Sequence, residues 1–396
     1  MNYPRCQLLP GREKSLLRRH PWVFSGALAE PDAAFAPGET VLLCAADGVP
    51  LAVAAWSPES QLRARVWSFD PAEVIDADFF RARIARAAAW RRTLGLLDPA
   101  GGCRLIYSES DGLPGLIVDR YGEFAAAQFT GAGTERFRDT IAGLLMELPF
   151  LRGVYERSDT PVRGKEGLAG RSGMLAGEPI PAEVDIVEEG LTFAVDLRHG
   201  QKTGFYFDLR PARSVVRRHA AGRRVLNVFS YTGGFAVAAL AGGAVSVLNV
   251  DSSAPALAQA EKNLRRNGFA SGWENRCGDA FRILRDLDGA GEKFDLVILD
   301  PPKLIPGKAA LLRGCRGYQD LARLGFKLLN PGGMLGNFSC SGLMTAELFQ
   351  KITAAAALEA GRDAAVIDRM EQAPDHPTAL AVPETFYLKG LLSRVE

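Results

Sequence analysis

The stretch of residues 225–235, Val-Leu-Asn-Val-Phe-Ser-Tyr-Thr-Gly-Gly-Phe, constrains the fold of this chain most strongly. It begins with apolar and β-branched residues over the length of a strand, passes through Gly233-Gly234, and continues into an alanine-rich segment of helical character. A strand, a glycine turn and a helix in this order form the nucleotide-binding unit of an open α/β sheet. Glycine suits the turn because it lacks a Cβ atom, so a ligand can approach the backbone closely.

An acidic residue accompanies this turn at the spacing of a nucleotide site. A second apolar strand, residues 245–250, is followed by Asp251, about 20 residues beyond the glycines. A carboxylate at this distance commonly accepts hydrogen bonds from ribose hydroxyls. The glycines alone are equally typical of a plain tight turn, so the prediction depends on the turn and the acid together.

Composition places the chain among ordinary globular proteins of two or three domains. It has 396 residues, 47% hydrophobic and 23% charged, with a net charge of +1. Any nucleic-acid binding must therefore depend on local basic patches and not on the bulk charge. The six cysteines are scattered without a CxxC pair, which indicates neither a zinc site nor a disulfide framework and fits a reducing cytosol. No segment has the pattern of a signal peptide or of a membrane span, so we expect a cytoplasmic protein.

Residues 1–73 are predicted to form a small β-rich domain, because short apolar runs alternate there with Pro, Gly and Asp turns. Arg63 and Arg65 lie on one face of its closing strand. Together with His20-Pro-Trp-Val-Phe24 and Pro37-Gly-Glu39, this strand resembles a PUA domain, an RNA-binding module. The spacing alone is also compatible with a β-barrel whose charged face is solvated.

The remaining chain is predicted to form two further domains. Residues 74–182 contain an arginine-rich helix at 76–97, whose arginines can be solvated or can meet phosphates, and then strands and a second helix. This order indicates a small α+β domain. Residues 183–396 begin with a hairpin, and from residue 225 strands alternate with helices. Such alternation predicts an α/β fold with a mainly parallel, Rossmann-like sheet covered by helices on both faces.

Three aspartates lie at or beyond the carboxyl ends of successive predicted strands: Asp251, Asp279 and Asp300. Ligands bind at this edge of an open α/β sheet. A single Asp in such a position often only caps the next helix. The three together with the glycine turn favour a ligand site. The arrangement is similar to that of class I S-adenosylmethionine (SAM) methyltransferases, in which acids at strand ends hold the ribose, the adenine and the reacting group.

Asp300-Pro-Pro-Lys303 follows a continuous apolar strand. The two prolines fix φ and remove two N–H donors, so the chain leaves the strand stiffly and with unused carbonyl groups. A planar base can lie against such a wall while the Asp carboxyl meets a ring nitrogen or an amino group. The motif resembles motif IV of nucleic-acid methyltransferases, although Lys303 replaces the aromatic residue that amino-group methyltransferases use for stacking.

Cys340 ends the next core strand, in Phe338-Ser-Cys-Ser-Gly342. A cysteine in a core is commonly inert, but this one is expected at the same sheet edge as Asp300. Carbon 5 of cytosine is a poor nucleophile, and a thiolate that adds to carbon 6 makes carbon 5 electron-rich enough to attack a methylsulfonium. Asp300 would hydrogen-bond the ring at N3 and support the charge that develops there.

Taken together, these motifs resemble the RlmI-like bacterial family of 23S ribosomal RNA cytosine-5 methyltransferases over essentially the whole chain. The segments that carry the resemblance are residues 227–235, 300–303, 315–318, 338–344 and 375–377. The resemblance implies a class I methyltransferase domain, SAM as cofactor, ribosomal RNA as partner and Cys340 as nucleophile. One departure concerns product release: other RNA cytosine-5 methyltransferases carry a second cysteine at the position of Lys303.

The resemblance also implies the residues of each site. The residues expected to bind SAM are Lys202, Thr203, Tyr206, Asp208, Asn227, Phe229, Ser230, Tyr231, Gly233, Gly234, Asp251, Ser252, Asp279 and Ala280. Those expected to bind RNA are Arg63, Arg65 and Lys303, with Cys340 and Asp300 catalytic. No metal is expected, and the protein is expected to be a monomer or a homodimer.

Two other functions are compatible with parts of the sequence. Methylation of a guanine or adenine nitrogen in RNA would need only Asp300 and its prolines, with Cys340 incidental. A non-catalytic RNA-binding protein would carry a vestigial SAM pocket, but the intact Asp251, Asp279 and Asp300 argue against it.

Overall fold

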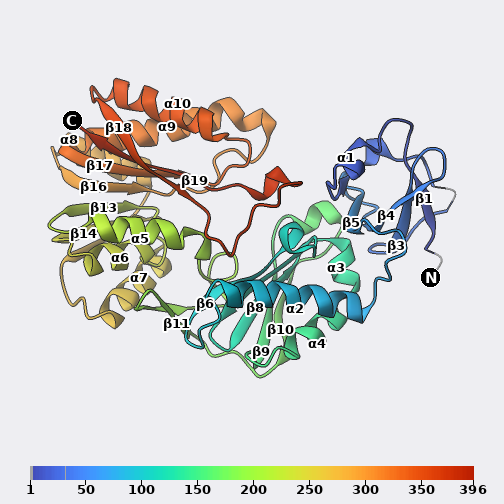
Figure 1. Cartoon of the computed structure of the whole chain (residues 1–396). Helices are drawn as coiled ribbons and strands as arrows, with labels where there is room; N and C mark the ends of the chain where they lie inside the picture. The colour runs from blue at the N-terminus through green and yellow to red at the C-terminus, as the bar shows by residue number, and fades with distance from the viewer. Residues whose placement is uncertain (1–2, 32) are drawn as a thin grey trace. The chain divides into compact units, whose positions relative to one another are not determined.

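The computed structural model describes residues 3–31 and 33–396, and the chain divides into two compact units (Figure 1). The first unit comprises residues 1–187, 195–207 and 374–385. The second comprises residues 188–194, 208–373 and 386–396. Residues 195–207 and 374–385, which we expected within the domain of residues 183–396, thus pack with the first unit, and the division into three domains stays a prediction.

The N-terminal part of the first unit is a small sheet with the strand order β1-β3-β4-β5-β2. Its elements are β1 (Arg5–Gln7), α1 (Lys14–Leu17), β2 (Trp22–Val23), η1 (Ser25–Ala27), β3 (Thr40–Cys44), β4 (Pro50–Trp56) and β5 (Ala64–Ser68). β1 pairs with β3 in parallel, and the other pairs are antiparallel. Alternate side chains of these strands enclose a core that includes Val41, Leu43, Trp56 and Val66.

The rest of the first unit is a sheet with the order β10-β9-β8-β7-β6, flanked by helices. Its elements are α2 (Ala77–Thr93), β6 (Gly102–Tyr107), η2 (Ser108–Asp111), β7 (Leu116–Tyr121), β8 (Phe124–Phe129), α3 (Ala132–Arg136), α4 (Arg138–Met146), β9 (Gly153–Ser158), η3 (Arg163–Glu166) and β10 (Arg171–Gly177). Helix α2 begins where the Asp76 carboxylate accepts the Phe79 N–H at 3.0 Å.

One hydrophobic core joins both parts of the first unit. Trp67 of β5 contacts Phe79 and Phe80 of α2 edge to face. Gly133 of α3 lies so close to β4 that a Cβ atom there would come within 2.4 Å of the Ala55 Cβ. The β-rich part therefore packs on the α+β part as a continuous body.

The second unit is built on a sheet with the order β15-β14-β13-β16-β17-β19-β18. Its strands are β13 (Arg224–Val228), β14 (Ser246–Asp251), β15 (Trp273–Cys277), β16 (Phe294–Leu299), β17 (Leu329–Ser339), β18 (Ala364–Glu371) and β19 (Lys389–Val395). The pairs from β15 to β17 are parallel, whereas β19 is antiparallel to both β17 and β18. The strand order reverses at β13, and ligands bind at the carboxyl ends of strands at such a switch point.

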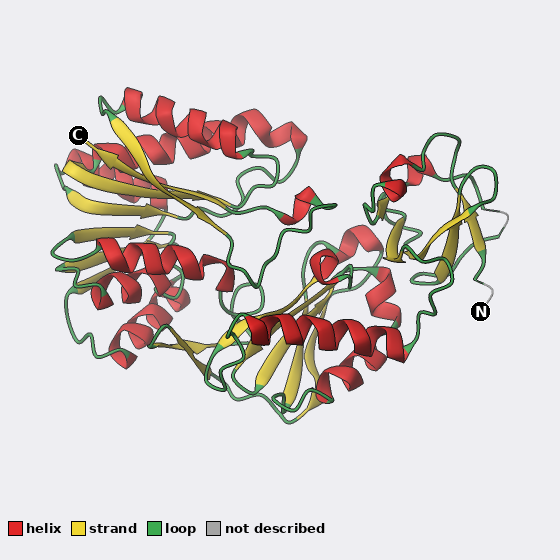
Figure 2. Ribbon diagram, in the orientation of Figure 1, coloured by secondary structure: helices red, strands yellow, loops and turns green. Residues whose placement is uncertain are grey.

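Helices cover both faces of this sheet, which confirms the expected Rossmann-like α/β fold. The helical elements of the second unit are α5 (Arg210–His219), α6 (Gly234–Ala241), α7 (Ala254–Arg266), α8 (Ala280–Gly289), η5 (Lys308–Ala310), α9 (Leu311–Lys327) and α10 (Ala346–Glu359). The short helix η4 (Phe207–Leu209) spans the sequence boundary of the units, and η6 (Pro383–Thr385) belongs to the first unit. Helix α6 packs on α5 and α7, and α9 packs on α8 and α10, so the two groups lie on opposite faces (Figure 2). The hairpin of β11 (Val184–Glu188) and β12 (Leu191–Val195) lies at the sequence boundary of the two units.

Candidate active site

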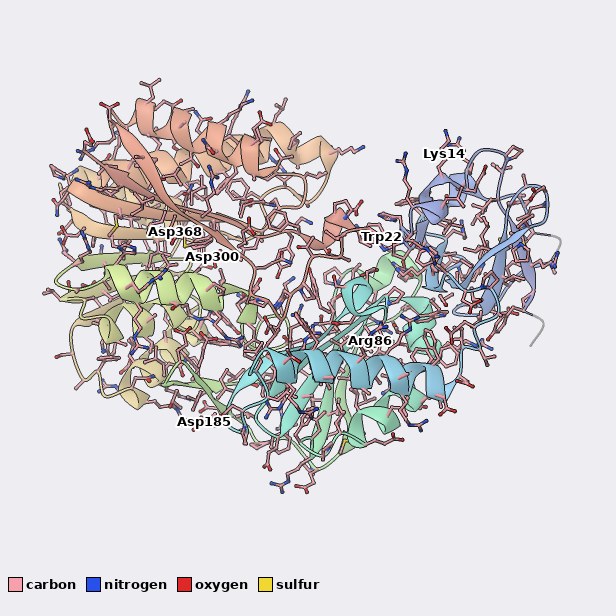
Figure 3. The ribbon with its side chains drawn as sticks, viewed as in Figure 1. Lys14, Trp22, Arg86, Asp185, Asp300 and Asp368 are labelled. Carbon is pink, nitrogen blue, oxygen red and sulfur yellow. The ribbon has the colours of Figure 1, made fainter. Side chains whose placement is uncertain are left out.

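Asp300 and Cys340 are each the first residue after a strand, and the two strands are neighbours. β16 pairs in parallel with β17, with Leu299 opposite Asn337, so both residues reach the carboxyl edge of the sheet (Figure 3 labels Asp300). β13 pairs with β16 on the other side, with Val228 opposite Leu299. The glycine turn after β13 therefore lies at the same edge.

The turn after β13 has an unusual backbone. Phe229 and Tyr231 have φ values of 60° and 46°, and Gly233 has φ of 79°. Left-handed conformations cost free energy for residues that have a Cβ atom, and they concentrate at functional sites. Glycine is required at position 233 for two reasons. Its φ is positive, and a Cβ atom there would lie 2.9 Å from the Ala260 Cβ of α7. The sequence predicted the need for glycine but not the two left-handed residues before it.

Asp251, the last residue of β14, holds this turn in place. One of its carboxylate oxygens accepts the Tyr231 N–H and the other accepts the Ser253 N–H, both at 2.8 Å. A carboxylate oxygen has more than one acceptor site, so these bonds are compatible with further hydrogen bonds from ribose hydroxyls.

Polar atoms at the turn fit a nucleoside cofactor. Asn227 Oδ1 and Ser230 Oγ are buried and have no hydrogen-bond partner among the described residues. Buried polar groups are nearly always hydrogen-bonded, so these two atoms beside the turn are compatible with hydrogen bonds to a bound nucleoside. Gly234 begins α6, and the first N–H groups of a helix attract anionic groups such as the carboxylate of SAM.

Asp279 lies two residues beyond β15, at the same edge of the sheet as Asp251 and Asp300. Its carboxylate accepts the Arg282 N–H at 2.9 Å and caps α8, which begins at Ala280. The side chain is exposed, so the cap leaves acceptor sites available. Ser252 directly follows Asp251 after the end of β14.

The carboxyl group of Asp300 has a perturbed acidity. Burial, and next the negative charge of Asp208, raise its pKa from 3.8 to about 7, while the Arg213 guanidinium opposes the shift. Arg213 is itself held by Glu188 in a bidentate pair at 2.6 and 2.7 Å. Asp208 accepts a 2.5 Å hydrogen bond from the Tyr387 hydroxyl. The Asp300 carboxyl group can therefore carry a proton near neutral pH and donate it to a hydrogen-bond acceptor.

The turn that contains Cys340 is fixed by buried hydrogen bonds. The Ser341 hydroxyl lies 2.9 Å from the Tyr318 hydroxyl of α9 and accepts the Ile305 N–H at 3.3 Å. The Lys389 ammonium donates to the Ser341 carbonyl at 2.9 Å. The Cys340 side chain is partly exposed, so a substrate can reach it. Neither Tyr318 nor Lys389 was predicted as a site residue, although Tyr318 lies in segment 315–318, one of those that carry the family resemblance.

Three residues expected to bind SAM belong to the first unit: Lys202, Thr203 and Tyr206. The Thr203 hydroxyl donates to Asp119 of β7 at 2.5 Å and accepts the Tyr121 hydroxyl at 3.2 Å. Lys202 has a left-handed backbone with φ of 56°, and the Tyr206 hydroxyl donates to Gln201 at 2.9 Å. The next expected residue, Asp208, lies in the second unit.

The residues expected to bind RNA differ in how strongly their side chains interact with the rest of the protein. Arg65 forms a bidentate pair with Glu166 at 2.7 and 2.9 Å, with side chains only 13% and 2% exposed, which favours a structural role. Arg63 is half-buried, donates to the Pro58 carbonyl and stacks over Trp56. Lys303 is exposed beside the candidate active site.

Two family models match this chain. One, described as an S-adenosylmethionine-dependent methyltransferase, covers residues 168–394, and the other, a PUA-like domain, covers residues 7–69. With the strand-end site described above, they define the class: a methyltransferase that uses SAM as its cofactor and carries an N-terminal PUA-like domain.

Relatives narrow this class further. The protein named ribosomal RNA large subunit methyltransferase I from Salmonella arizonae is 49% identical over 395 residues, 100% of this chain and 98% of the relative. The chain belongs to the ribosomal RNA large subunit methyltransferase I family.

Solved structures share the fold. A SAM-dependent methyltransferase from Streptococcus mutans matches with a TM-score of 0.85 at 22% identity, over 99% of this chain and 100% of that chain. A methyltransferase designated SMU.776, complexed with SAH, also matches with a TM-score of 0.85 at 23% identity, over 100% of both chains. In the described part of the chain, no helix combines the length and apolar character needed to cross a membrane.

Proposed function

We propose that this protein transfers the methyl group of SAM to carbon 5 of a cytosine in large-subunit ribosomal RNA. The observation that carries the proposal is the placement of Cys340 and Asp300 directly after two neighbouring parallel strands. The printed name of the relatives supports ribosomal RNA as the substrate. The PUA-like domain supports an RNA substrate in general.

The chemistry begins at Cys340. Its thiolate forms a bond to carbon 6 of the cytosine, and the electron pair of the 5,6 double bond moves toward N3. Asp300 donates its proton to N3 and so neutralises the charge that develops there. A pKa of about 7 supports this role, because an ordinary aspartate would hold no proton at neutral pH.

Bound SAM supplies an electrophilic methyl group attached to a positively charged sulfur. The residues proposed to hold it are Asn227, Ser230, Gly233 and Asp251 at the turn, and Asp279 at the neighbouring strand end. Once carbon 5 has gained the methyl group, a base removes the proton from that carbon. The electron pair of the broken C–H bond restores the double bond, and the bond from carbon 6 to sulfur breaks to return the thiolate. N3 returns its proton to Asp300, so both side chains regain their starting forms.

The test uses RNA that carries 5-fluorocytidine, because fluorine at carbon 5 cannot leave as a proton does. Wild-type protein with SAM should form an adduct that survives denaturing electrophoresis, and Cys340→Ser should form none while it still binds SAM. Cys315→Ser is the matched control, because Cys315 is a second partly buried thiol of the same unit. Full methylation by Cys340→Ser would instead favour methylation of a base nitrogen, with Asp300 and its two prolines as the reactive centre.

The identity of the RNA can be tested in cells. Mapping of modified bases in ribosomal RNA from cells that lack this protein should show the loss of a 5-methylcytosine in the large-subunit RNA. An unchanged set of large-subunit modifications would contradict the proposed substrate.

A further inference from the structure

Lys389 is a buried lysine beside the candidate nucleophile. It is the first residue of β19, which pairs antiparallel with β17 so that Lys389 lies opposite Ser339, the residue before Cys340. Its exposed fraction is only 5%. Lysine is almost never this buried unless its charge has a partner, so the position calls for an explanation.

The surroundings of Lys389 hold its ammonium group against the turn that contains Cys340. Nζ donates to the carbonyl of Ser341 at 2.9 Å and lies 5.9 Å from the centre of the Phe386 ring. An ammonium has three N–H donors, so one bond to a carbonyl does not exhaust it.

Two other titratable groups act electrostatically on Lys389. Burial lowers its pKa from 10.5 to about 8, Lys303 lowers it as well, and Cys340 opposes the shift. The fourth titratable group of this cluster is Tyr318, whose pKa burial raises and which also interacts electrostatically with Cys340. Lys389 and Lys303 are thus the cations of the cluster, and Cys340 is the group whose negative form they favour.

A purely structural role for Lys389 explains less. The Ser341 carbonyl needs only a hydrogen-bond donor, and a neutral donor would satisfy it without the cost of burying a charge. A cation at this position instead has a chemical use, because the thiolate and not the thiol is the nucleophilic form of cysteine. The Tyr318 and Ser341 hydroxyl groups already hold the turn from its other side.

We propose that the Lys389 ammonium activates Cys340 by stabilising its thiolate as an ion pair. The S–H bond breaks, its electron pair stays on sulfur, and the proton passes to solvent water, which leaves a thiolate beside the ammonium group. Lys389 is therefore a positioning residue that acts through Cys340. This inference rests on the proposed role of Cys340 as the nucleophile.

The test measures the acidity of the Cys340 thiol in the full-length protein without RNA. Iodoacetamide alkylates thiolates, and mass spectrometry of the Cys340 peptide reports its rate of alkylation at each pH, with Cys340→Ser to assign the signal. In wild type the midpoint of this pH dependence should lie below the ordinary pKa of cysteine, which is about 8.5. Lys389→Met should raise the midpoint by about one unit or more, which slows alkylation at neutral pH by about tenfold.

Two further variants separate charge from structure. Lys389→Arg keeps the cation and should keep the low midpoint. Lys351→Met removes an exposed lysine of α10 and should leave the midpoint unchanged. A change that only loosened the turn would affect Lys389→Arg and Lys389→Met alike.

Either of two results would overturn the inference. The first is an equal midpoint in wild type and folded Lys389→Met. The second is a wild-type midpoint at or above the ordinary value, which needs no variant to interpret. Failure of the 5-fluorocytidine adduct to form would instead count against Cys340 as the nucleophile, whatever its acidity, so the two proposals fail separately.

Discussion

Asp300 shows how position changes the chemistry of a single residue. The sequence placed this carboxyl after an apolar strand, where two prolines direct the chain away from the sheet. Its acidity depends first on burial and then on Asp208 and Arg213, which lie 92 and 87 positions earlier in the chain, and no local motif predicts such partners. Lys389 was missed for the same reason, because only the pairing of β19 with β17 brings it to Cys340.

A pH dependence of stability follows from Asp300. Its pKa is about 7 in the folded protein and near 3.8 when unfolded, so the folded state binds the extra proton between these values. The free energy of unfolding should therefore fall as pH rises from about 4 to about 7, by at most about 1.4 kcal/mol per pH unit from this group. Asp300→Asn removes the titration and should lose less stability between pH 5 and pH 8 than wild type.

Urea unfolding at the two pH values measures this difference. Asp279→Asn is the matched control, because this aspartate lies at the same sheet edge but is exposed. If Asp300→Asn and wild type lost equal stability over this range, the acidity assigned to Asp300 would be wrong. The same proton matters for the proposed reaction, since only protonated Asp300 can donate to N3.

At the scale of elements, most helices and strands follow from the pattern of apolar residues, and the exceptions have physical causes. The apolar pattern predicts a helix from Tyr318 to Leu329, whereas helix α9 already begins at Leu311. Gly314 and Gly317 weaken the local helix propensity, which hid the first turns. Gly314 is demanded by packing, because a Cβ atom there would lie 2.4 Å from an Ile305 side-chain carbon. The sequence shows the cost of this glycine but not the close contact that requires it.

The Arg65–Glu166 pair illustrates a similar limit between elements. Strand alternation predicts that Arg63 and Arg65 share a face, but it could not indicate that Glu166 of η3 approaches Arg65. Arg65→Met leaves the Glu166 carboxylate buried without its partner and should destabilise the protein by about 3–5 kcal/mol. Thermal or urea unfolding measures the loss.

A double variant and a neighbouring variant control this prediction. Arg65→Met with Glu166→Gln removes the uncompensated charge and should recover most of the stability. Arg63→Ala removes a partly exposed arginine and should cost much less. If Arg65→Met left stability unchanged but weakened RNA binding, Arg65 would be an RNA contact, as the sequence suggested, and the structural role would be wrong.

At the scale of the whole molecule, the sequence could not reveal which unit each segment joins. Residues 374–385 follow the β18 strand of the second unit, yet Asp375 accepts the Arg104 N–H and the Arg91 guanidinium of the first. Arg91 was expected among arginines that are solvated or meet phosphates, but its side chain is 0% exposed and pairs with Asp111. Contacts over such sequence distances leave no periodic signal.

Because the net charge is only +1, the affinity of the protein for RNA must depend on local basic patches. The best exposed basic cluster of the PUA-like part surrounds α1, where Arg12, Lys14, Arg18 and Arg19 are exposed (Figure 3 labels Lys14). Each phosphate contact contributes roughly 0.7 to 0.9 to the slope of log affinity against log salt concentration. A double variant, Lys14→Ser with Arg18→Ser, should therefore weaken binding to a ribosomal RNA fragment at low salt and should lower this slope by about 1.4 to 1.8. Fluorescence anisotropy at several salt concentrations gives both quantities.

A second double variant is the control for this prediction. Arg282→Ser with Lys351→Ser removes two exposed cations of the second unit and should change the slope much less. An equal fall in both double variants would mean that RNA senses only the total charge, and an unchanged slope in the α1 variant would place the phosphate contacts elsewhere.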